Sequence, residues 1–542
     1  SGDWSSDVCS SDLFFLVGII SEAGHYFCTH YPTGVGPKTT GMITVLCVQG
    51  GSVFLSFNER GDHPCPKKTL QFLFGLLFAI SASTIHAASK DTSDEDNKLN
   101  GDCIGCHYNV TPGIVKQHLE SPMANAKKHE DSVSCTDCHG ESHVTNDDYA
   151  KAAMPTMETC AECHKKETKQ YKKGKHNLAW FGMKSQIAWH GQPGAIVDKG
   201  YKGCSGCHKL GKKGILGIAD GKNELTHDNG KEAADYRYGN AQCDACHTRH
   251  TFSQDEARDP RACSNCHMGF DHPQWEMFMS SKHGIIWSIE DQKGERDGRA
   301  PTCQKCHMNE GDHEVTTAWG FLGLRIPTQK NVLALIDAAP SLEQPLRDLA
   351  KLLPTGSYID VDDDPQWVLD RALILQAAGI LDSGLQPTER FVEIVVQGRA
   401  ARAPEEFNAL RTKMKNICNE CHSKGFVQEH FVASDNVIKA ADHEFAKAIA
   451  AVQALYKDGI LEKPEGWDFA PDLLHYYDAK TNVEQELYLI MLEYRQRAFQ
   501  GAFHASNDYM HWYGWAPLKT AVNNILQEAK QMRAEHEAKQ KH

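Results

Sequence analysis

The sequence predicts a mainly α-helical protein in two parts, and three observations lead to that prediction. Seven copies of one short cysteine motif lie between residues 100 and 315, in a stretch with many Gly and Lys and little long periodicity. After residue 417, apolar residues recur at helical spacing over long stretches. We find no convincing series of strands after residue 87.

Composition and charge exclude several classes of protein. The chain has 542 residues, with 41% hydrophobic and 24% charged residues, which is ordinary usage for globular proteins. It is therefore neither wholly disordered nor a polytopic membrane protein. Its net charge of −14 argues against a nucleic-acid partner. The unusual counts are 20 Cys and 29 His, which point to metal sites, disulfides or thioethers.

The pattern Cys-x-x-Cys-His occurs eight times, where chance predicts roughly 0.04 occurrences for this composition. The sixteen cysteines of these motifs are Cys103, Cys106, Cys135, Cys138, Cys160, Cys163, Cys204, Cys207, Cys243, Cys246, Cys263, Cys266, Cys303, Cys306, Cys418 and Cys421. The histidines that end the motifs are His107, His139, His164, His208, His247, His267, His307 and His422.

This spacing is typical of covalent haem c attachment. Two cysteines three residues apart can each form a thioether with a haem vinyl group, and the adjacent His then reaches the iron as its proximal ligand. Cys-x-x-Cys pairs also build zinc sites, but zinc does not require a His after every second Cys. We therefore expect eight covalently attached haem c groups. The porphyrins would supply most of the apolar core of the part that holds seven of them.

The beginning of the chain carries an export signal. Residues 67–87 contain two lysines, an apolar run too short to span a bilayer, and small residues up to Ala87, which is the pattern of a secretory signal peptide. A buried helix is the alternative interpretation of the apolar run. Because haem c is attached outside the cytoplasm, we expect a periplasmic protein. No later apolar run is long enough to span a membrane, so we expect it to be soluble.

Residues 1–66 precede this signal, where native sequence is not expected. Their stretch from Ser5 to Leu13 looks like translated non-coding or adapter DNA, and we interpret residues 1–66 as non-native or wrongly assigned upstream sequence. The four cysteines outside the motifs all lie here. We therefore expect no structural disulfide in the haem-bearing part.

The remainder divides by composition into residues 88–325 with seven motifs, 326–430 with the eighth motif, and 431–542, which is strongly helical. Helix signals mark the last two parts. Asp364-Pro365 opens a helix that Gly379 ends. An apolar stripe from Phe445 to Tyr456 is closed by Gly459.

Two further helices follow near the end of the chain. Thr481 with Glu484 forms a capping box ahead of an apolar stripe. Pro517 starts a last helix with one apolar face. Such stripes favour core or subunit packing.

Histidines outside the motifs are candidates for the second axial position of each haem iron. A haem with two protein ligands carries electrons, whereas one with an open position can bind a substrate. His143 and His250 each follow a motif closely, so they reach a neighbouring haem more easily than their own. The further candidates are His176, His283, His313 and His504. The alternative interpretation of any one histidine outside the motifs is an ordinary surface or core residue that binds no iron.

Asp271 and His272 form an adjacent carboxylate and imidazole shortly after the sixth motif. Such a pair can move protons, and redox reactions of small nitrogen compounds couple electrons to protons. An imidazole titrates near pH 6.5, which suits proton donation at neutral pH. The alternative is a hydrogen-bonded loop pair with no chemical role.

Several of these features together resemble the octahaem hydroxylamine oxidoreductase family. They are the eight motifs, the sequence Cys-His-Thr-Arg-His at 246–250, Asp271-His272, Ser281-Lys282-His283-Gly284 and Gly514-Trp515. The resemblance covers about residues 100–535. It implies a mostly helical, haem-packed subunit that forms a homotrimer, with two-ligand transfer haems and one open catalytic haem.

The resemblance also implies roles for individual residues. The catalytic haem is the fourth, on Cys204 and Cys207 with His208 as its proximal ligand, and Asp271 and His272 are the distal acid–base pair. The ligands of the transfer haems fall on His143, His176, His250, His283, His313 and His504.

The chain departs from the family in three places. A seventh distal histidine falls where this chain has Met123, which is itself a plausible ligand that would raise that haem's potential. His118 or His129 are alternatives. The membrane tail of some relatives is missing.

The third departure concerns the tyrosine that crosslinks to the catalytic haem of a neighbouring subunit in oxidising members. Its place is taken by His511, with Tyr509 and Tyr513 offset from it. Family members without this crosslink resemble nitrite and hydroxylamine reductases.

The expected function is therefore a periplasmic octahaem cytochrome c that reduces nitrite, hydroxylamine or both to ammonium at an open haem. Eight linked haems can deliver the six electrons that nitrite requires. One alternative is a hydroxylamine or hydrazine oxidoreductase working in the oxidative direction. Another is a pure electron-transfer cytochrome with every iron six-coordinate. A soluble cationic cytochrome or a quinol-linked donor suits the acidic chain as electron partner.

Overall fold

The computed structural model describes residues 96–126, 132–179, 207–208, 242–294, 298–320, 323–337, 340–360, 364–397, 400–475 and 480–541, together with three strands before residue 60. The chain divides into two compact units, Ser1–Asp91 and Thr92–His542.

The first unit contains a small antiparallel sheet, in the order β1 (Cys28–Thr29), β2 (Ile43–Gln49) and β3 (Ser52–Asn58). The second and third strands are rich in β-branched and apolar residues, and they pair antiparallel with Gln49 opposite Ser52. The expectation of no strand series concerns the chain after residue 87, so this sheet does not contradict it. The signal peptide expected at residues 67–87 lies outside the described residues.

The second unit is built from helices in every part that the structure describes, apart from one isolated bridge between Leu381 and Pro387. The mainly α-helical fold class is therefore confirmed.

The described residues between 96 and 320 form short helices and turns. The α-helices are α2 (Asp96–Val110), α3 (Pro112–Glu120), α4 (Cys135–His139), α5 (Met157–Ala161), α6 (Lys165–Lys173), α9 (Gln254–Arg258), α10 (Arg261–Ser264), α11 (Gln274–Ser280), α12 (Lys282–Lys293) and α13 (Cys303–His307). The 3-10 turns are η2 (Asn146–Lys151), η3 (His176–Leu178), η8 (Gln242–Ala245) and η9 (Asn309–Gly311).

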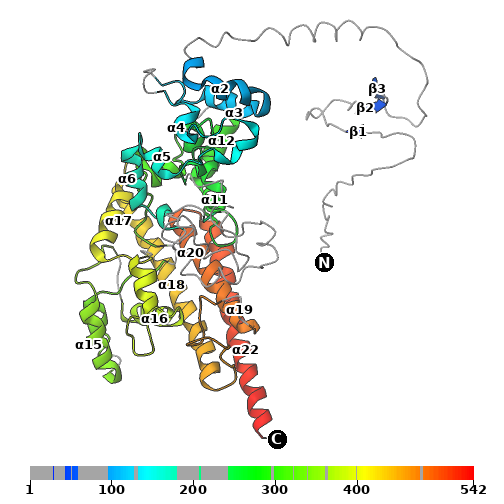
Figure 1. Cartoon of the computed structure of the whole chain (residues 1–542). Coiled ribbons are helices and arrows are strands. Elements are labelled where there is room, and N and C mark those ends of the chain that lie inside the picture. Colours follow the sequence, from blue (N-terminus) through cyan, green and yellow to red (C-terminus); the bar gives the residue numbers. More distant parts are fainter. Residues whose placement is uncertain are drawn as a thin grey trace. The chain divides into compact units, whose positions relative to one another are not determined.

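Longer helices follow (Figure 1). The α-helices are α14 (Gln329–Leu333), α15 (Glu343–Leu352), α16 (Pro365–Ala377), α17 (Pro404–Cys418), α18 (Lys424–Lys457), α19 (Asn482–Leu489), α20 (Arg495–Phe503), α21 (Asn507–Tyr509) and α22 (Ala516–Gln540). Between them lie the 3-10 turn η10 (Pro340–Leu342) and the π-helical segments η11 (Phe391–Gln397), η13 (Ile490–Tyr494) and η14 (Met510–Trp515). The central α18 packs against α16, α20 and α22.

The helix signals in the sequence mark real helix ends. Asp364 Oδ1 accepts a hydrogen bond of 2.8 Å from the backbone N–H of Trp367, which caps α16. Glu484 accepts from the backbone N–H of Thr481 at 3.1 Å, so the predicted capping box starts α19. The helix α18 begins directly after the eighth motif, so the boundary expected at residue 430 falls inside it.

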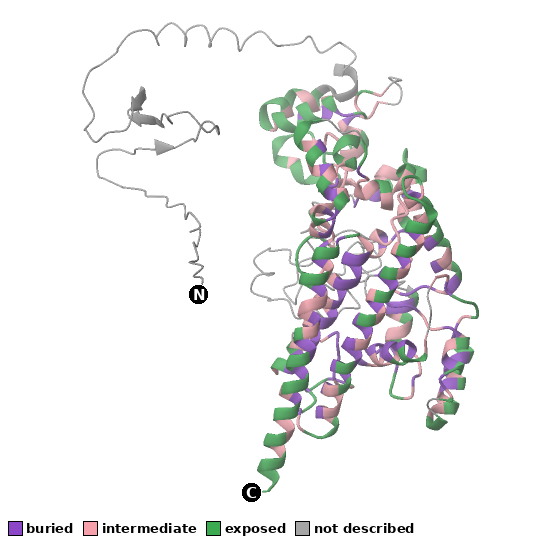
Figure 2. Ribbon diagram, turned by 180° about the vertical axis from the view of Figure 1, so that it is seen from behind, coloured by how far each residue is buried: buried purple, intermediate pink, exposed green. Residues whose placement is uncertain are grey.

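Burial is unevenly divided between the two halves of this unit. Figure 2 shows buried residues concentrated on the long helices, whereas the short helices are mostly exposed or intermediate. The long helices form one large apolar cluster that includes Phe445, Ile449, Leu487 and Ile525. The short helices bury few apolar side chains against one another. Their packing therefore depends on other apolar groups.

A buried carboxylate fixes three of the long helices. Asp442 of α18 accepts hydrogen bonds from Trp367 of α16 at 2.7 Å and from Arg495 of α20 at 2.6 Å, and pairs with Arg371 at 3.0 Å. Because a buried charge must be paired and hydrogen-bonded, this cluster sets how the helices meet. Within the described residues, no helix is long and apolar enough to cross a membrane.

Candidate functional site

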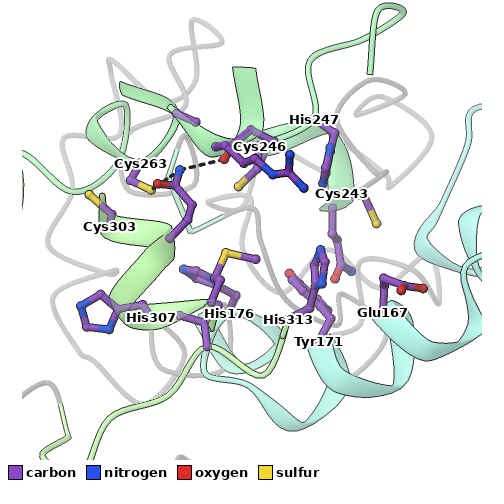
Figure 3. A pocket seen from close by; sticks show the side chains of 18 of the residues that line it. Glu167, Tyr171, His176, Cys243, Cys246, His247, Cys263, Cys303, His307 and His313 are labelled. Atoms are coloured by element: carbon purple, nitrogen blue, oxygen red, sulfur yellow. Dashed lines mark hydrogen bonds between the residues drawn. The ribbon is translucent and has the colours of Figure 1, made fainter. Parts of the chain in front are cut away.

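One continuous cavity of about 2990 Å³ runs through the part with the short helices and reaches α17, α18 and α20. The proximal histidines of all eight motifs line it. Figure 3 shows part of it, where cysteines such as Cys263 and histidines such as His176 and His313 reach into the same space. Protein interiors are close-packed and hold few voids larger than a water molecule, so this cavity suits large apolar groups.

The motifs present their side chains from a single helical turn. The helices α4 and α13 each span one complete motif. Elsewhere the motif histidine donates its backbone N–H to the first cysteine, as His267 does to Cys263 at 2.9 Å. Residues three and four apart lie on one face of such a turn, so both sulfur atoms and the imidazole face the cavity together. This arrangement fits two thioethers and a proximal ligand.

Each of the six predicted transfer-haem ligands lies opposite one motif histidine. These six motif histidines belong to six different motifs. The ring-centre distances are His107–His143 6.0 Å, His139–His250 6.3 Å, His247–His313 6.3 Å, His267–His176 6.0 Å, His307–His504 6.3 Å and His422–His283 6.1 Å. His143, which follows the second motif, thus pairs with the first motif, and His250, which follows the fifth, pairs with the second. The geometry suits two imidazoles on opposite faces of one macrocycle.

Hydrogen bonds orient many of these rings. The Nδ1 atom of His139 lies 2.9 Å from Ala153 O, that of His143 lies 2.8 Å from Asp148 Oδ1, and that of His504 lies 2.7 Å from Gln500 O. An imidazole held through Nδ1 directs Nε2 at a metal, which is the usual outer arrangement around a ligating histidine. Asp148 and Gln500 were not predicted from the sequence, because nothing in their local pattern indicates this contact.

Burial favours the neutral form of four of the imidazoles in these pairs, which is the form that iron ligation requires. It lowers the pKa of His267 and of His307 to about 4, with neighbouring histidines adding to the effect. Burial also lowers the pKa of His176 and of His504.

The fourth motif is described only in part, because Cys204 lies outside the described residues while Cys207 and His208 lie within them. The Nδ1 atom of His208 lies 2.9 Å from Ala179 O. The ring of His272 lies 6.0 Å from that of His208. The predicted acid–base residue therefore faces the proximal histidine of the predicted catalytic haem.

Asp271 and His272 are in direct contact. The distance between His272 Nδ1 and Asp271 Oδ2 is 3.0 Å. Burial raises the pKa of Asp271, but the hydrogen bond and the charge of His272 outweigh burial and hold the pKa below its usual value. Asp271 is therefore ionised near neutral pH and fixes the Nδ1–H tautomer of His272. The pair is suited to holding and passing one proton.

The third motif is the one without a clear second ligand. Among the described residues, no second histidine ring is recorded in contact with the ring of His164. Met123 and His118 both line the cavity, and His118 Nε2 is buried without a hydrogen-bond partner. His129 lies outside the described residues. The choice among these three remains a prediction.

Seven motifs form a row along the cavity, because a thiol of each motif lies close enough to a thiol of the next to influence its pKa. Burial and the neighbouring Cys103 raise the pKa of Cys135 to about 11. Burial and the neighbouring Cys160 likewise raise the pKa of Cys138. The remaining neighbouring pairs are Cys160 with Cys243, Cys246 with Cys263, Cys263 with Cys303, and Cys306 with Cys418. We call this series the motif row, and it runs in chain order. Of the fourth motif, the structure describes only Cys207 and His208, and neither belongs to these pairs.

Among the described residues, His272 connects the fourth motif to the motif row, because its ring contacts both His208 and His267. The ring of His272 lies 6.1 Å from that of His267, the proximal histidine of the sixth motif. Gln274 supports this junction, since its Oε1 accepts from His267 Nδ1 at 3.2 Å and its Nε2 donates to Gln500 at 2.7 Å. The role of Gln274 was not predicted, although it stands only two residues after His272.

The residues around the position of the family's crosslinking tyrosine lie outside the lining of this cavity. Tyr509 is buried and stacks on Tyr513, with ring centres 4.8 Å apart, while His511 is exposed and contacts Trp512. Within the described part, none of these residues lines the cavity. No group of three or more His, Cys, Asp or Glu there is arranged to hold a bare metal ion.

Two families of known proteins match parts of the chain. Residues 131–323 match the family described as "Seven times multi-haem cytochrome CxxCH", and residues 78–140 match "Cytochrome c554 and c-prime".

A curated relative from Kuenenia stuttgartiensis bears the name "Probable nitrite reductase-hydroxylamine oxidoreductase fusion protein". It is 26% identical over 407 residues, which cover 67% of this chain and 38% of that protein. The chain thus spans about two fifths of the length of the curated relative it matches.

Two solved structures share the fold. One is the "Kuenenia stuttgartiensis reducing HAO-like protein complex Kustc0457/Kustc0458", with a TM-score of 0.53 and 21% identity over 81% of this chain and 86% of that chain. The other is a "Hypothetical multiheme protein", with a TM-score of 0.53 and 18% identity over 87% of this chain and 100% of that chain. At these identities the likeness concerns the fold.

Proposed function

We propose that this chain, which is a mainly α-helical multihaem cytochrome c, reduces nitrite, hydroxylamine or both to ammonium. The reaction takes place at the haem carried by the fourth motif, and seven further haem c groups supply its electrons. The name of the curated relative, which joins nitrite reductase and hydroxylamine oxidoreductase, supports this class of substrate.

The observation that carries the proposal is the position of Asp271 and His272. They are the acid–base pair expected from sequence, and His272 lies 6.0 Å across the cavity from His208, the proximal histidine of the fourth motif. A proton donor on the distal side of a haem stands where a small ligand would bind.

The residues divide the work as follows. When bound, the haem supplies electrons and an iron atom that binds a small nitrogen compound. His208 would hold that iron, and the contact between its Nδ1 atom and Ala179 O keeps the ring in place. His272 donates protons to the oxygen atoms that leave as water. Asp271 keeps His272 in the tautomer with its proton on Nδ1.

The motif row supports a reaction of several electrons. Six electrons must reach nitrite in one cycle, and haems on the row can store them and pass them along. The junction between His267 and His272 gives the fourth haem a neighbour on the row. A soluble cationic cytochrome or a quinol-linked donor is the proposed source, because the chain carries a net charge of −14.

Location and assembly follow from the same reasoning. We place the protein in the periplasm, because haem c is attached outside the cytoplasm and residues 67–87 have the pattern of a signal peptide. The proposed assembly is a homotrimer. Sedimentation equilibrium of the haem-loaded protein measures this oligomeric state.

Turnover in both directions tests the function. We expect the haem-loaded protein, with reduced methyl viologen as donor, to convert nitrite and hydroxylamine to ammonium in stoichiometric yield. We expect no haem to stay attached to a peptide containing Tyr509 or Tyr513 after denaturation and proteolysis. Faster oxidation of hydroxylamine or hydrazine than reduction of nitrite, together with such a crosslink, would reverse the proposed direction. Absence of turnover in either direction would leave the protein an electron carrier.

A further inference from the structure

We propose that one face of α6 is a docking surface for an acidic electron-carrier protein, which delivers electrons to the haem on Cys160, Cys163 and His164. The carrier is a small one-electron protein whose docking face is rich in carboxylates. Of the two donors proposed above, this surface selects a quinol-linked donor with such a face over a cationic cytochrome. The inference goes beyond the proposed function, because it concerns where electrons enter, whichever nitrogen compound is reduced.

The segment that follows the third motif is strongly basic. Residues 165–175 contain six lysines and one glutamate, which is a local charge of +5 in a chain whose net charge is −14. A patch of lysines creates a local field that attracts negatively charged groups. The net charge of the whole chain therefore does not describe this patch, where a cationic protein would be repelled and an acidic one attracted.

Four of these lysines share one face of α6. Lys165, Lys169, Lys172 and Lys173 are exposed, and they line one surface hollow of about 470 Å³. Their spacings of four, seven and eight residues place them on the same side of a helix. Lys172 also pairs with Glu158 at 4.0 Å, an exposed contact that is worth little and that a carboxylate of the carrier can replace.

The beginning of α6 is fixed to the third motif. His164 is the N-cap residue of α6, and its carbonyl oxygen accepts a hydrogen bond of 2.8 Å from the hydroxyl of Thr168. The helix also packs against α5, which carries Cys160. Cys163 and His164 are themselves exposed, so this motif lies at the surface. A protein bound to the lysines is therefore held beside the haem of the third motif.

The other end of α6 is fixed beside the fifth motif. Gln170 Oε1 accepts a hydrogen bond of 3.3 Å from the backbone N–H of His313, and the backbone N–H of Lys175 donates to Val315 O at 2.8 Å. His313 is the predicted ligand opposite His247. Both ends of α6 are thus attached to segments of the motif row, so the basic face needs little ordering when a partner binds.

Entry at the third motif gives a short path to the proposed site of reaction. The third motif neighbours the fifth through Cys160 and Cys243, and the fifth neighbours the sixth. The ring of His267 in the sixth motif contacts that of His272. An electron that entered at the first motif would have to cross the second and third haems before it reached the same point.

Other surfaces and other occupants fit less well. Near the first motif, Tyr108 and Val110 are 65% and 60% exposed, an apolar pair on which charge attraction does not act. An anionic membrane would also attract lysines. However, none of the exposed large apolar residues in the described part of the chain lies on α6, so the helix has no side chain to insert into lipid. An acidic protein is the occupant that this face fits.

Each docking event transfers one electron. The reduced carrier loses one electron, the ferric iron of the third-motif haem becomes ferrous, and no bond forms or breaks. The oxidised carrier then leaves. Six such events supply the electrons that the reduction of nitrite to ammonium requires.

Reversing two charges of the hollow tests the inference, with flavodoxin as an acidic one-electron probe. We expect Lys165→Glu, Lys169→Glu to slow stopped-flow reduction of the haem-loaded protein by reduced flavodoxin by roughly 10–100-fold at low ionic strength. The difference should vanish at about 0.5 M salt, where the charges are screened. Calorimetric titration with oxidised flavodoxin should show a matching loss of affinity. Lys165→Arg, Lys169→Arg keeps both charges and should behave as the wild type.

Two lysines of α22 provide a matched control. Lys530→Glu, Lys539→Glu makes the same change in net charge at exposed positions outside the lining of the main cavity. We expect this variant to be reduced at the wild-type rate. Equal slowing in both glutamate variants would overturn the inference, because overall charge would then attract the carrier. An unchanged rate in the α6 variant would also overturn it.

Two further measurements exclude other roles of the lysines. If they pair with haem propionates, Lys165→Glu, Lys169→Glu should shift a haem midpoint potential without changing the affinity for flavodoxin, which would overturn the inference. If they bind a membrane, the same variant should lose binding to phosphatidylglycerol vesicles while its reduction by flavodoxin is unchanged. That result would also assign the surface to another partner.

These results separate the inference from the proposed function. If flavodoxin docks on α6 but the wild type turns over neither nitrite nor hydroxylamine with methyl viologen, the docking surface stands and the proposed function is wrong. If the wild type reduces nitrite with methyl viologen but flavodoxin reduces the wild type and the α6 variant equally fast, the function stands and the docking surface is wrong.

Discussion

At the scale of single residues, Asp271 and His272 make different contributions that substitution can separate. His272→Ala removes the proton donor, so we expect nitrite turnover to fall by roughly 10²–10⁴-fold, the usual effect of losing a general acid. The loss should be smaller at low pH, where water can supply the proton. Steady-state ammonium production against pH measures it.

Asp271→Asn keeps the size of the side chain while removing its charge. We expect it to lower turnover less than His272→Ala, because the amide can still contact the ring but no longer favours the required tautomer. Both variants should keep eight haems and the oligomeric state of the wild type. Wild-type rates in both variants would show that the pair is only structural.

At the scale of elements, the contact between α20 and η14 depends on a glycine. A Cβ atom on Gly514 would fall 2.6 Å from Ala498 Cα and 2.8 Å from Arg497 C. These are backbone atoms, so one of the two helical segments would have to shift. We expect Gly514→Ala to lower the free energy of unfolding by about 1–3 kcal/mol. Guanidinium titration followed by circular dichroism measures this change.

A second glycine serves as the control for that substitution. Gly425 lies in the first turn of α18, and a Cβ atom there would have no other atom within 4 Å. We expect Gly425→Ala to leave stability unchanged or to raise it by up to ~1 kcal/mol. Equal losses in both variants would mean that the close approach at Gly514 is not the cause.

The ion pair between α16 and α18 predicts how stability changes with acid. Burial raises the pKa of Asp364, but its bond to Lys439 at 2.9 Å outweighs burial and holds the pKa below the usual value. An aspartate with a depressed pKa in the folded state stabilises it above about pH 4 and loses that contribution as the pH falls further. Asp364→Asn keeps the cap on α16 and removes only the charge.

We therefore expect Asp364→Asn to cost ~0.5 kcal/mol at pH 7, because solvent partly screens the pair, whose Asp364 and Lys439 side chains are 40% and 25% exposed. The difference from wild type should shrink as the pH falls below about 4. Guanidinium titrations at pH 7 and pH 3 make the comparison. A difference as large at pH 3 as at pH 7 would contradict the electrostatic explanation and indicate damage to the cap.

At the scale of the whole molecule, the motif row predicts how electrons move. The denatured protein should exceed the mass of its polypeptide by eight haems. A Cys204→Ala, Cys207→Ala variant should carry seven, and these should still be reduced in one phase, because the fourth motif lies beside the row. A Cys243→Ala, Cys246→Ala variant should be reduced in two phases. The fifth motif lies between the third and the sixth in the row, so its loss separates the haems on either side.

Stopped-flow reduction by dithionite, followed by haem absorbance, makes this comparison. Helix content by circular dichroism must match the wild type, so that slow reduction is not the result of misfolding. Reduction in a single phase after loss of the fifth motif would mean that electrons enter at several points and that the row is not the main path.

The sequence was sufficient for features that depend on neighbouring residues. Covalent haem attachment could be predicted because both cysteines and the proximal histidine of each motif lie within one helical turn. The ends of α16 and α19 could be predicted because capping uses side chains three residues away. The hairpin of β2 and β3 also has a local pattern, but it lies in the segment interpreted as non-native.

The tertiary structure was needed for contacts between distant residues. The sequence identified His250 and His272 as candidates, but only the fold shows which motif each one faces. His139 meets His250 across more than a hundred residues, and the loop that carries His272 brings it opposite His208 and beside His267. Local spacing cannot encode such contacts, because they depend on how helices far apart in the chain pack around one cavity.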